Sequence, residues 1–297
     1  MKKFLATFLF IIVSLSCFAM VGCAEEPQKP HEHSFVGADG FYCEGCDSYV
    51  VDTNDEFAQA LAKTDSVINI IVIADVQVDV GAHDHKAFGG DATTAINIKG
   101  SGSQKITFNQ TNSDWNHVTI KNESAVLSLE NVAITNSGCN DGPWNRHDIN
   151  FNVNVKLTNV TSDKALALKN GATLKNVTIN ENNGDCYAIW IRANGQTVSI
   201  NGLTVNNDVV GGRGIKIDEQ YIETPAKVTL NINNATFKTN KKSAILVKSV
   251  AGAEINLSNI NISNVNADKV NAVWVDGASA EYADLVIVSG ANKIVEP

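Results

Sequence analysis

The chain has few prolines, methionines, aromatic residues and basic residues for its length. Its 297 residues include 5 Pro and 2 Met, and 7% are aromatic. The chain has 23 Lys and Arg against 32 Asp and Glu, so its net charge is -9. A nucleic-acid partner requires a basic face, and this charge therefore argues against one. Hydrophobic residues make up 44%, enough for a sizeable core. Asparagine is abundant, and its enrichment is typical of turn-rich, repetitive β folds.

The first residues have the pattern of an export signal. Two lysines precede an apolar run from Phe4 through Leu15, as in the charged and apolar regions of a signal peptide. The run leads into Met20-Val21-Gly22-Cys23, which resembles the lipobox of bacterial lipoproteins, whose cysteine is acylated. The alternative is an uncleaved anchor, because the stretch from Phe4 to Val21 is just long enough to span a bilayer.

This pattern predicts a lipoprotein signal peptide over residues 1–22, lipidation at Cys23 and a polar tether over residues 23–30. The tether is too poor in apolar groups to fold by itself. We therefore expect an exported protein that is held at the outer face of a bacterial cell membrane through its lipid alone.

A small segment, residues 31–50, carries four side chains suited to zinc. They are His31, His33, Cys43 and Cys46. A Cys-x2-Cys pair lets two thiolates reach one ion, and structural zinc takes four nitrogen or sulfur ligands. The spacing resembles a minimal zinc ribbon and favours structural zinc, although a true ribbon usually has a second Cys-x2-Cys. A Cys43–Cys46 disulfide, as expected in an oxidising compartment, is the open alternative.

Strand-like segments recur along residues 51–297. The first repeat set reads L-x-L-x-N-V or a close variant, and its members begin at Leu127, Val155, Ala172, Val198 and Ile255. The second repeat set lies between them, and its members begin at Ala165, Ala188, Gly214, Ala244 and Ala272. Two interleaved strand types with no helix between them cannot form a βαβ sheet. A parallel solenoid accommodates both, because its stacked coils align the apolar residues into columns.

The repeat is preceded by a predicted helix. Residues 54–63 place Phe57 and Leu61 at helical spacing behind the capping residues Asn54 and Asp55, and the helix is expected to cover the first coil. This helix, an I-x-I-x-G segment ending at Gly100 and the stacked L-x-L-x-N rungs together resemble the pectate-lyase-like superfamily. The resemblance covers about residues 50–297. It implies an all-β, single-stranded, right-handed parallel β-helix with an N-terminal capping helix.

Carbohydrate-active members of this superfamily bind on an outer strand face and its loops. The outward positions of the second repeat set are therefore candidates, because an exposed tryptophan beside charged groups can stack on a sugar ring and bond its hydroxyls. The expected ligand-binding residues are Trp144, Trp190, Arg192, Lys216, Asp218 and Trp274. The alternative is that Arg192, Asp218, Lys248 and Asp276 pair with one another along the solenoid.

The longest break in the repeat, residues 137–148, is a second candidate site. Trp144 offers an aromatic platform, and Arg146, His147 and Asp148 are weak candidates for catalysis.

Two further pairs lie in loops. Cys139 and Cys186 both fall in turns and are candidates for a disulfide, although the longer loop would have to fold back. His83 and His85 form a second His-x-His pair, which raises extracellular zinc binding as an alternative function.

The resemblance also implies an enzyme alternative, a polysaccharide lyase or glycoside hydrolase. Pectate lyases use calcium held by carboxylates beside a catalytic Arg or Lys, and polygalacturonases use clustered Asp pairs. Neither arrangement is plain in this sequence. We therefore expect a cell-surface carbohydrate-binding or adhesion module, with a glycan or a surface protein as its partner. Zinc is the expected cofactor, and calcium is left open.

Overall fold

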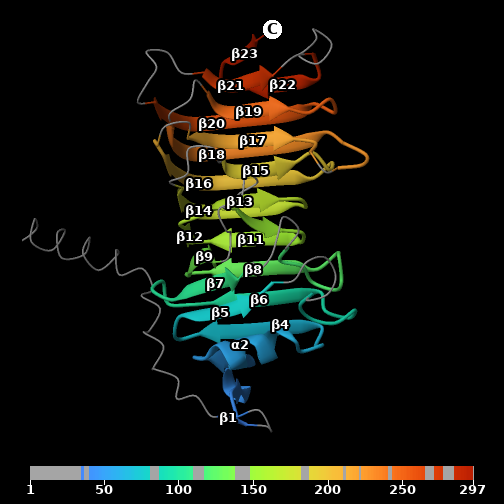
Figure 1. Ribbon diagram of the computed structural model, residues 1–297, viewed down its shortest axis with the longest axis vertical. Coiled ribbons are helices and arrows are strands. Elements are labelled where there is room, and N and C mark those ends of the chain that lie inside the picture. Colours follow the sequence, from blue (N-terminus) through green and yellow to red (C-terminus); the bar gives the residue numbers. More distant parts are fainter. Residues whose placement is uncertain are drawn as a thin grey trace, which may run out of the picture.

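The computed structural model describes residues 35–36, 40–80, 87–109, 117–137, 148–181, 187–209, 212–220, 222–239, 243–264, 271–276 and 284–296. Within these ranges the strands stack one above another along the longest axis, from β1 at one end to β23 at the other (Figure 1). Neighbouring coils pair in parallel. The predicted fold class, an all-β parallel solenoid, is confirmed.

Ladder 1 is the row of strands that contains the first repeat set. Its strands are β3 (Ser48–Val51), β4 (Val67–Val72), β6 (Ala95–Lys99), β8 (Val126–Glu130), β11 (Asn154–Thr158), the first halves of β14 (Ala172–Asn180), β16 (Thr197–Asn207), β18 (Val228–Thr239) and β20 (Ala253–Asn264), and β22 (Val286–Ser289). The predicted register holds, since Leu127 is paired with Val155 and Val155 with Ala172.

Ladder 2 follows ladder 1 around each coil. It consists of β5 (Val76–Asp79), β7 (Lys105–Asn109), β9 (Ala133–Ser137), β12 (Thr161–Ser162) and the second halves of β14, β16, β18 and β20. The sequence analysis did not separate this ladder, because its residues directly follow the corner asparagine and read as a continuation of the first set.

Ladder 3 forms a separate sheet and contains the second repeat set. Its strands are β10 (Asp148–Phe151), β13 (Ala165–Leu168), β15 (Tyr187–Arg192), β17 (Arg213–Asp218), β19 (Ser243–Lys248), β21 (Asn271–Asp276) and β23 (Lys293–Glu296). Alternate side chains of the three ladders point inward and form one continuous apolar core. Ile189, Ile215, Ile245 and Val273 show this alignment in ladder 3, each at most 1% exposed. Burying such a side chain contributes about 1.5–3 kcal/mol.

Asparagines turn the chain between ladders 1 and 2. Asn131, Asn159, Asn176, Asn234 and Asn259 all have φ between 52° and 58°, the left-handed region that asparagine tolerates better than most residues. Their amides also bond from coil to coil, as from Nδ2 of Asn259 to Oδ1 of Asn234 at 3.0 Å. The strand-end asparagines of the L-x-L-x-N repeat therefore both turn the chain and join neighbouring coils.

The N-terminal segment continues ladder 1. β1 (Phe35–Val36), β2 (Tyr42–Cys43) and β3 pair antiparallel, with the short helix η1 (Glu44–Cys46) between β2 and β3. β3 then pairs in parallel with β4. The described part of residues 31–50 therefore shares its sheet with the solenoid.

The predicted amphipathic helix is present as α2 (Asn54–Leu61), with Phe57 and Leu61 buried. It lies against β4 and β5 at the N-terminal end of the stack (Figure 1). Its capping residue is Thr53, whose Oγ1 accepts from the Glu56 amide at 3.3 Å, so the assignment of Asn54 and Asp55 as caps was wrong. Thr53 has the extended backbone that an N-cap requires, whereas Asn54 already belongs to the helix.

Candidate functional site

The outer face of ladder 3 has the register that the sequence predicted. Pairing aligns Ala167, Trp190, Lys216, Leu246 and Trp274 in one column. Trp190 and Trp274 are half-buried, while Ala167 and Leu246 are buried. The column exists, but it offers less exposed surface than alternation alone would suggest.

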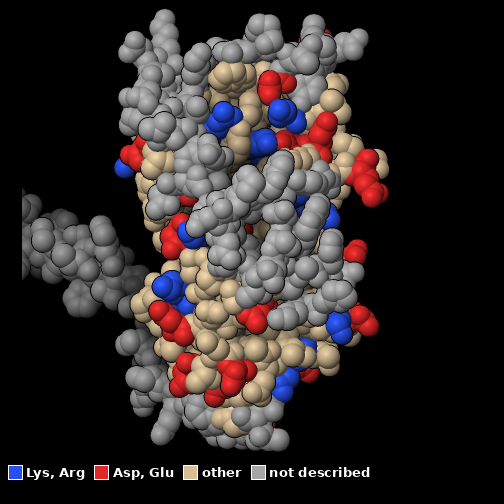
Figure 2. All heavy atoms as spheres, in the orientation of Figure 1, with Lys and Arg blue, Asp and Glu red and all other residues tan. Residues whose placement is uncertain are grey.

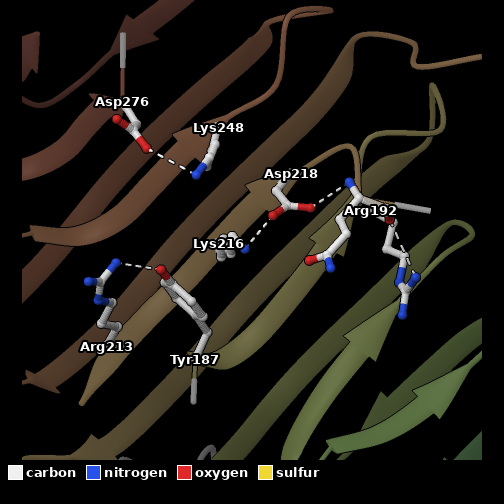
Figure 3. Close-up of polar contacts among 8 residues, drawn as sticks. Tyr187, Arg192, Arg213, Lys216, Asp218, Lys248 and Asp276 are labelled. Carbon is white, nitrogen blue, oxygen red and sulfur yellow. Dashed lines mark hydrogen bonds and ion pairs between the residues drawn. The ribbon is translucent and has the colours of Figure 1, made fainter. Parts of the chain in front are cut away.

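Charged residues beside this column form ion pairs within the solenoid (Figure 3). Lys216 pairs with Asp218 on the same strand, and Lys248 Nζ lies 3.6 Å from Asp276 Oδ2. Asp218 also accepts from the Gln220 amide at 2.7 Å and is only 4% exposed. The alternative of pairing along the solenoid is therefore confirmed for Lys248 and Asp276, which lie on neighbouring strands.

The aromatic rings of this face are already in contact with cations of the chain. Arg192 Cζ lies 4.6 Å from the centroid of Trp190, and Lys216 Nζ lies 5.0 Å from it. Lys216 Nζ is also 5.2 Å from the centroid of Tyr187, which hydrogen-bonds Arg213 (Figure 3). Burial raises the pKa of Tyr187, although the Arg213 charge opposes this rise. These cation–π contacts stabilise the face from within.

The sequence analysis missed Tyr187 and Arg213. Their pairing across β15 and β17 follows from the same register, because both stand three residues before the Trp190–Lys216 pair.

Most loop candidates lie outside the described residues. These are Trp144, Arg146, His147, Cys139, Cys186, His83, His85, His31, His33 and Cys23. Asp148 is described as the first residue of β10, and it is 6% exposed. Its carbonyl accepts from Asn136 Nδ2 at 3.1 Å, which ties β10 to the end of β9.

The two described zinc candidates are neighbours. Cys43 directly precedes η1, Cys46 is its last residue, and their sulfurs are 2.9 Å apart. In the described part of the chain, no group of three or more His, Cys, Asp or Glu is arranged to hold a metal ion.

A shallow groove runs along the outer face of ladder 1. One hollow of about 530 Å³ covers the C-terminal coils, and another of about 450 Å³ covers the N-terminal coils. The hollows adjoin, because Lys156 and Thr158 of the second pair with Thr173 and Lys175 of the first. The groove therefore extends from Cys46 of η1 to Ser289 of β22.

Amides and hydroxyls line this groove in rows that continue from coil to coil. The polar residues of the C-terminal hollow are Thr173, Lys175, Ser199, Asn201, Asn231, Asn233, Asn256, Ser258 and Ser289. Several of them bond along the rows. Nδ2 of Asn256 donates to Oδ1 of Asn231 at 2.9 Å, and Oγ of Ser289 donates to Oδ1 of Asn256 at 2.6 Å.

The charge of the groove differs from that of the whole chain. Its described lining contains Lys99, Lys156, Lys175 and one acid, Glu130. Lys99 Nζ lies 3.4 Å from Glu130 Oε1, and this pair is exposed. Elsewhere the charges are mixed, and Figure 2 shows acidic and basic side chains interspersed over one face. The groove is thus locally basic on an acidic protein.

The sequence held a signal for this groove that the analysis did not use. In L-x-L-x-N the two x positions face outward, and they carry Ser128 and Glu130, then Lys156 and Thr158, in successive members. Short polar side chains at these positions are a weaker sequence signal for sugar binding than the tryptophans of the second repeat set.

Comparisons with known proteins find no matching family model, no matching curated protein and no matching solved structure. Among the described residues, none of the helices has the length and apolar character needed to cross a membrane.

Proposed function

We propose that this protein is a binding module that holds an extended polysaccharide chain in the groove along ladder 1. The observation that carries the proposal is the set of amide, hydroxyl and lysine side chains that recurs in the groove on successive coils. An amide has two N–H donors and a carbonyl oxygen with two lone pairs, so one that bonds its neighbour in a row keeps capacity for a ligand. Serine and threonine hydroxyls add donors and acceptors of the kind that sugars need.

The repeat of the groove suits a repeating ligand. Neighbouring coils are roughly 4.8 Å apart, which is close to the length of one sugar unit in an extended chain. A polysaccharide lying along the solenoid axis would therefore meet similar groups at each coil. Many weak contacts of this type add up only when the ligand spans several coils.

The groove supports binding better than hydrolysis. Glycoside hydrolases use two carboxylates on either side of the scissile bond. The described lining offers Glu130, and this carboxylate is already paired with Lys99. Calcium-dependent cleavage would need several carboxylates around the ion. The lysines instead favour retention of acidic sugars beside neutral ones.

The expectations of export, of a lipid anchor and of a right-handed solenoid also belong to this proposal. The protein is exported, anchored by a lipid on Cys23 and displays the solenoid at the cell surface. The solenoid winds right-handed, as in the pectate-lyase-like superfamily and as parallel crossovers nearly always do. Trp274 and the ladder 3 face are a secondary contact surface for a glycan or a surface protein.

A polysaccharide array tests the proposal with residues 24–297, which lack the signal peptide and the acylated cysteine. Thr173 of β14 and Thr161 of β12 are both exposed, but only Thr173 lines the groove. Thr173→Trp should obstruct the groove and reduce retention at least tenfold, whereas Thr161→Trp on ladder 2 should leave it unchanged. Equal effects of the two substitutions, or no retention of any glycan, would contradict the groove. Release of shortened products would indicate an enzyme.

A further inference from the structure

The turn that joins β2 to β3 brings two thiols together. Cys43 ends β2, Cys46 ends η1, and Asp47 then adopts a left-handed conformation with φ 49°. The chain thus reverses within four residues. The Cys43 and Cys46 sulfurs lie 2.9 Å apart, Cys43 is fully buried and Cys46 is half-buried.

The separation fits a covalent bond better than a shared metal ion. Tetrahedral zinc with Zn–S distances of about 2.3 Å holds two sulfurs roughly 3.8 Å apart. The observed sulfurs are closer than that by nearly an ångström, and they are closer than two sulfurs in ordinary contact. An ion would have to push them apart, whereas a bond would only bring them further together.

We propose that Cys43 and Cys46 form an intramolecular disulfide in the exported protein. In this step the two thiols lose two protons and two electrons as the S–S bond forms. An oxidised disulfide of the extracellular medium accepts them and is reduced to two thiols by exchange. The assignment does not depend on the polysaccharide groove.

The surrounding contacts give the bond a structural role. Tyr42 Oη donates to Asp47 Oδ1 at 2.6 Å, and Ser48 Oγ donates to the Cys46 carbonyl at 3.0 Å, so the same turn is already braced. The disulfide fixes the turn before β3, the first strand of ladder 1. Because Cys46 lines the N-terminal end of the groove, the bond also fixes that end.

Glu44 lies between the two cysteines and provides a direct test. The full chain is expressed for export, purified without reductant, alkylated with N-ethylmaleimide under denaturing conditions and cut with a glutamate-specific protease. Cleavage after Glu32, Glu44 and Glu56 puts the cysteines on separate peptides, 33–44 and 45–56. A disulfide keeps these peptides joined, without label, until a reductant separates them. Separate, labelled peptides before reduction would overturn the proposal.

Metal content and stability complete the test. Zinc measured on the same sample should be well below one ion per chain, and one zinc per chain that disappears in Cys46→Ser would overturn the disulfide. Reductant should lower the thermal midpoint more for the parent chain than for a variant with Cys43→Ser and Cys46→Ser. That variant controls for Cys139 and Cys186, and an equal response of both proteins would contradict the structural role.

Discussion

Nδ2 of Asn159 donates a hydrogen bond to Oδ1 of Asn131 at 2.9 Å, and both residues turn the chain with φ 53°. Asn159 in turn accepts from Nδ2 of Asn176, the next corner, at 3.0 Å. One side chain therefore joins three successive coils while its backbone holds a conformation that most residues avoid. Each corner asparagine has these two separate roles, and substitution can separate them.

Asn159→Ala should lower the free energy of unfolding by about 2 kcal/mol, because both amide bonds are lost and alanine is strained at positive φ. Asn159→Gly should cost only about 1 kcal/mol, since glycine adopts this conformation without a Cβ clash. Urea unfolding followed by circular dichroism measures the two values. Equal losses in the two variants would show that the backbone conformation contributes little.

Gly202 occupies the same corner between Asn176 and Asn234. A Cβ there would lie 2.6 Å from Asn176 Oδ1, and φ is 81°. Gly202→Ala should therefore destabilise the protein by about 1–2 kcal/mol. Adding Asn176→Gly removes the clashing oxygen, so Gly202→Ala should cost less in that background than in the parent chain. If Gly202→Ala costs the same stability in both backgrounds, the strain comes from the backbone conformation of residue 202 alone.

The spacing of the repeats was sufficient to predict the fold class and the register of ladders 1 and 3. It also showed that an asparagine stands at the end of most strands in the first repeat set. These features depend on local alternation and on one residue type at each strand end, so they are visible in the chain. The helix was also visible, but its cap was misplaced by one residue at Thr53. Boundaries of this kind depend on backbone geometry at a single residue, which an apolar pattern does not specify.

The site was harder to predict because it depends on how coils stack. Trp190 looked like a sugar platform in the sequence, yet Lys216 and Arg192 lie against its ring in the structure. The groove is formed by short, unremarkable side chains such as Ser199 and Asn231. Only the register of neighbouring coils shows that they form a continuous surface.

Two ion pairs on ladder 3 differ in burial and should differ in energy. The side chains of Lys216 and Asp218 are 15% and 6% exposed, whereas those of Lys248 and Asp276 are 60% and 53% exposed. Asp218→Asn should cost about 3 kcal/mol of stability, because it leaves a poorly solvated lysine without its counter-charge. Asp276→Asn should cost less than about 0.5 kcal/mol. Thermal unfolding of both variants at neutral pH tests this, and similar losses would contradict the difference.

Burial of Tyr187 predicts a loss of stability in alkali. Its pKa in the folded protein is raised, so the folded state retains the phenolic proton to higher pH than the unfolded chain does. The corresponding stability is complete below the ordinary tyrosine pKa of about 10 and is lost as pH rises through the folded pKa. In Tyr187→Phe, the decline in urea midpoint between about pH 9 and pH 11 should be shallower than in the parent chain. Parallel declines would mean that Tyr187 does not ionise in this range.

The lysines of the groove predict a preference for acidic polysaccharides. The net negative charge of the whole chain would not predict this preference. Lys156 and Lys175 are exposed on neighbouring coils of the groove, so they should attract the carboxylates of an acidic polysaccharide. Replacing both with Gln should weaken binding of an acidic polysaccharide several-fold and reduce its sensitivity to salt, because fewer charges are then screened. Binding of a neutral polysaccharide should change little. Lys238→Gln, at an exposed position of ladder 2, is the control. An equal loss for acidic and neutral chains would mean that the lysines act through shape, and no loss at all would place the ligand on another face.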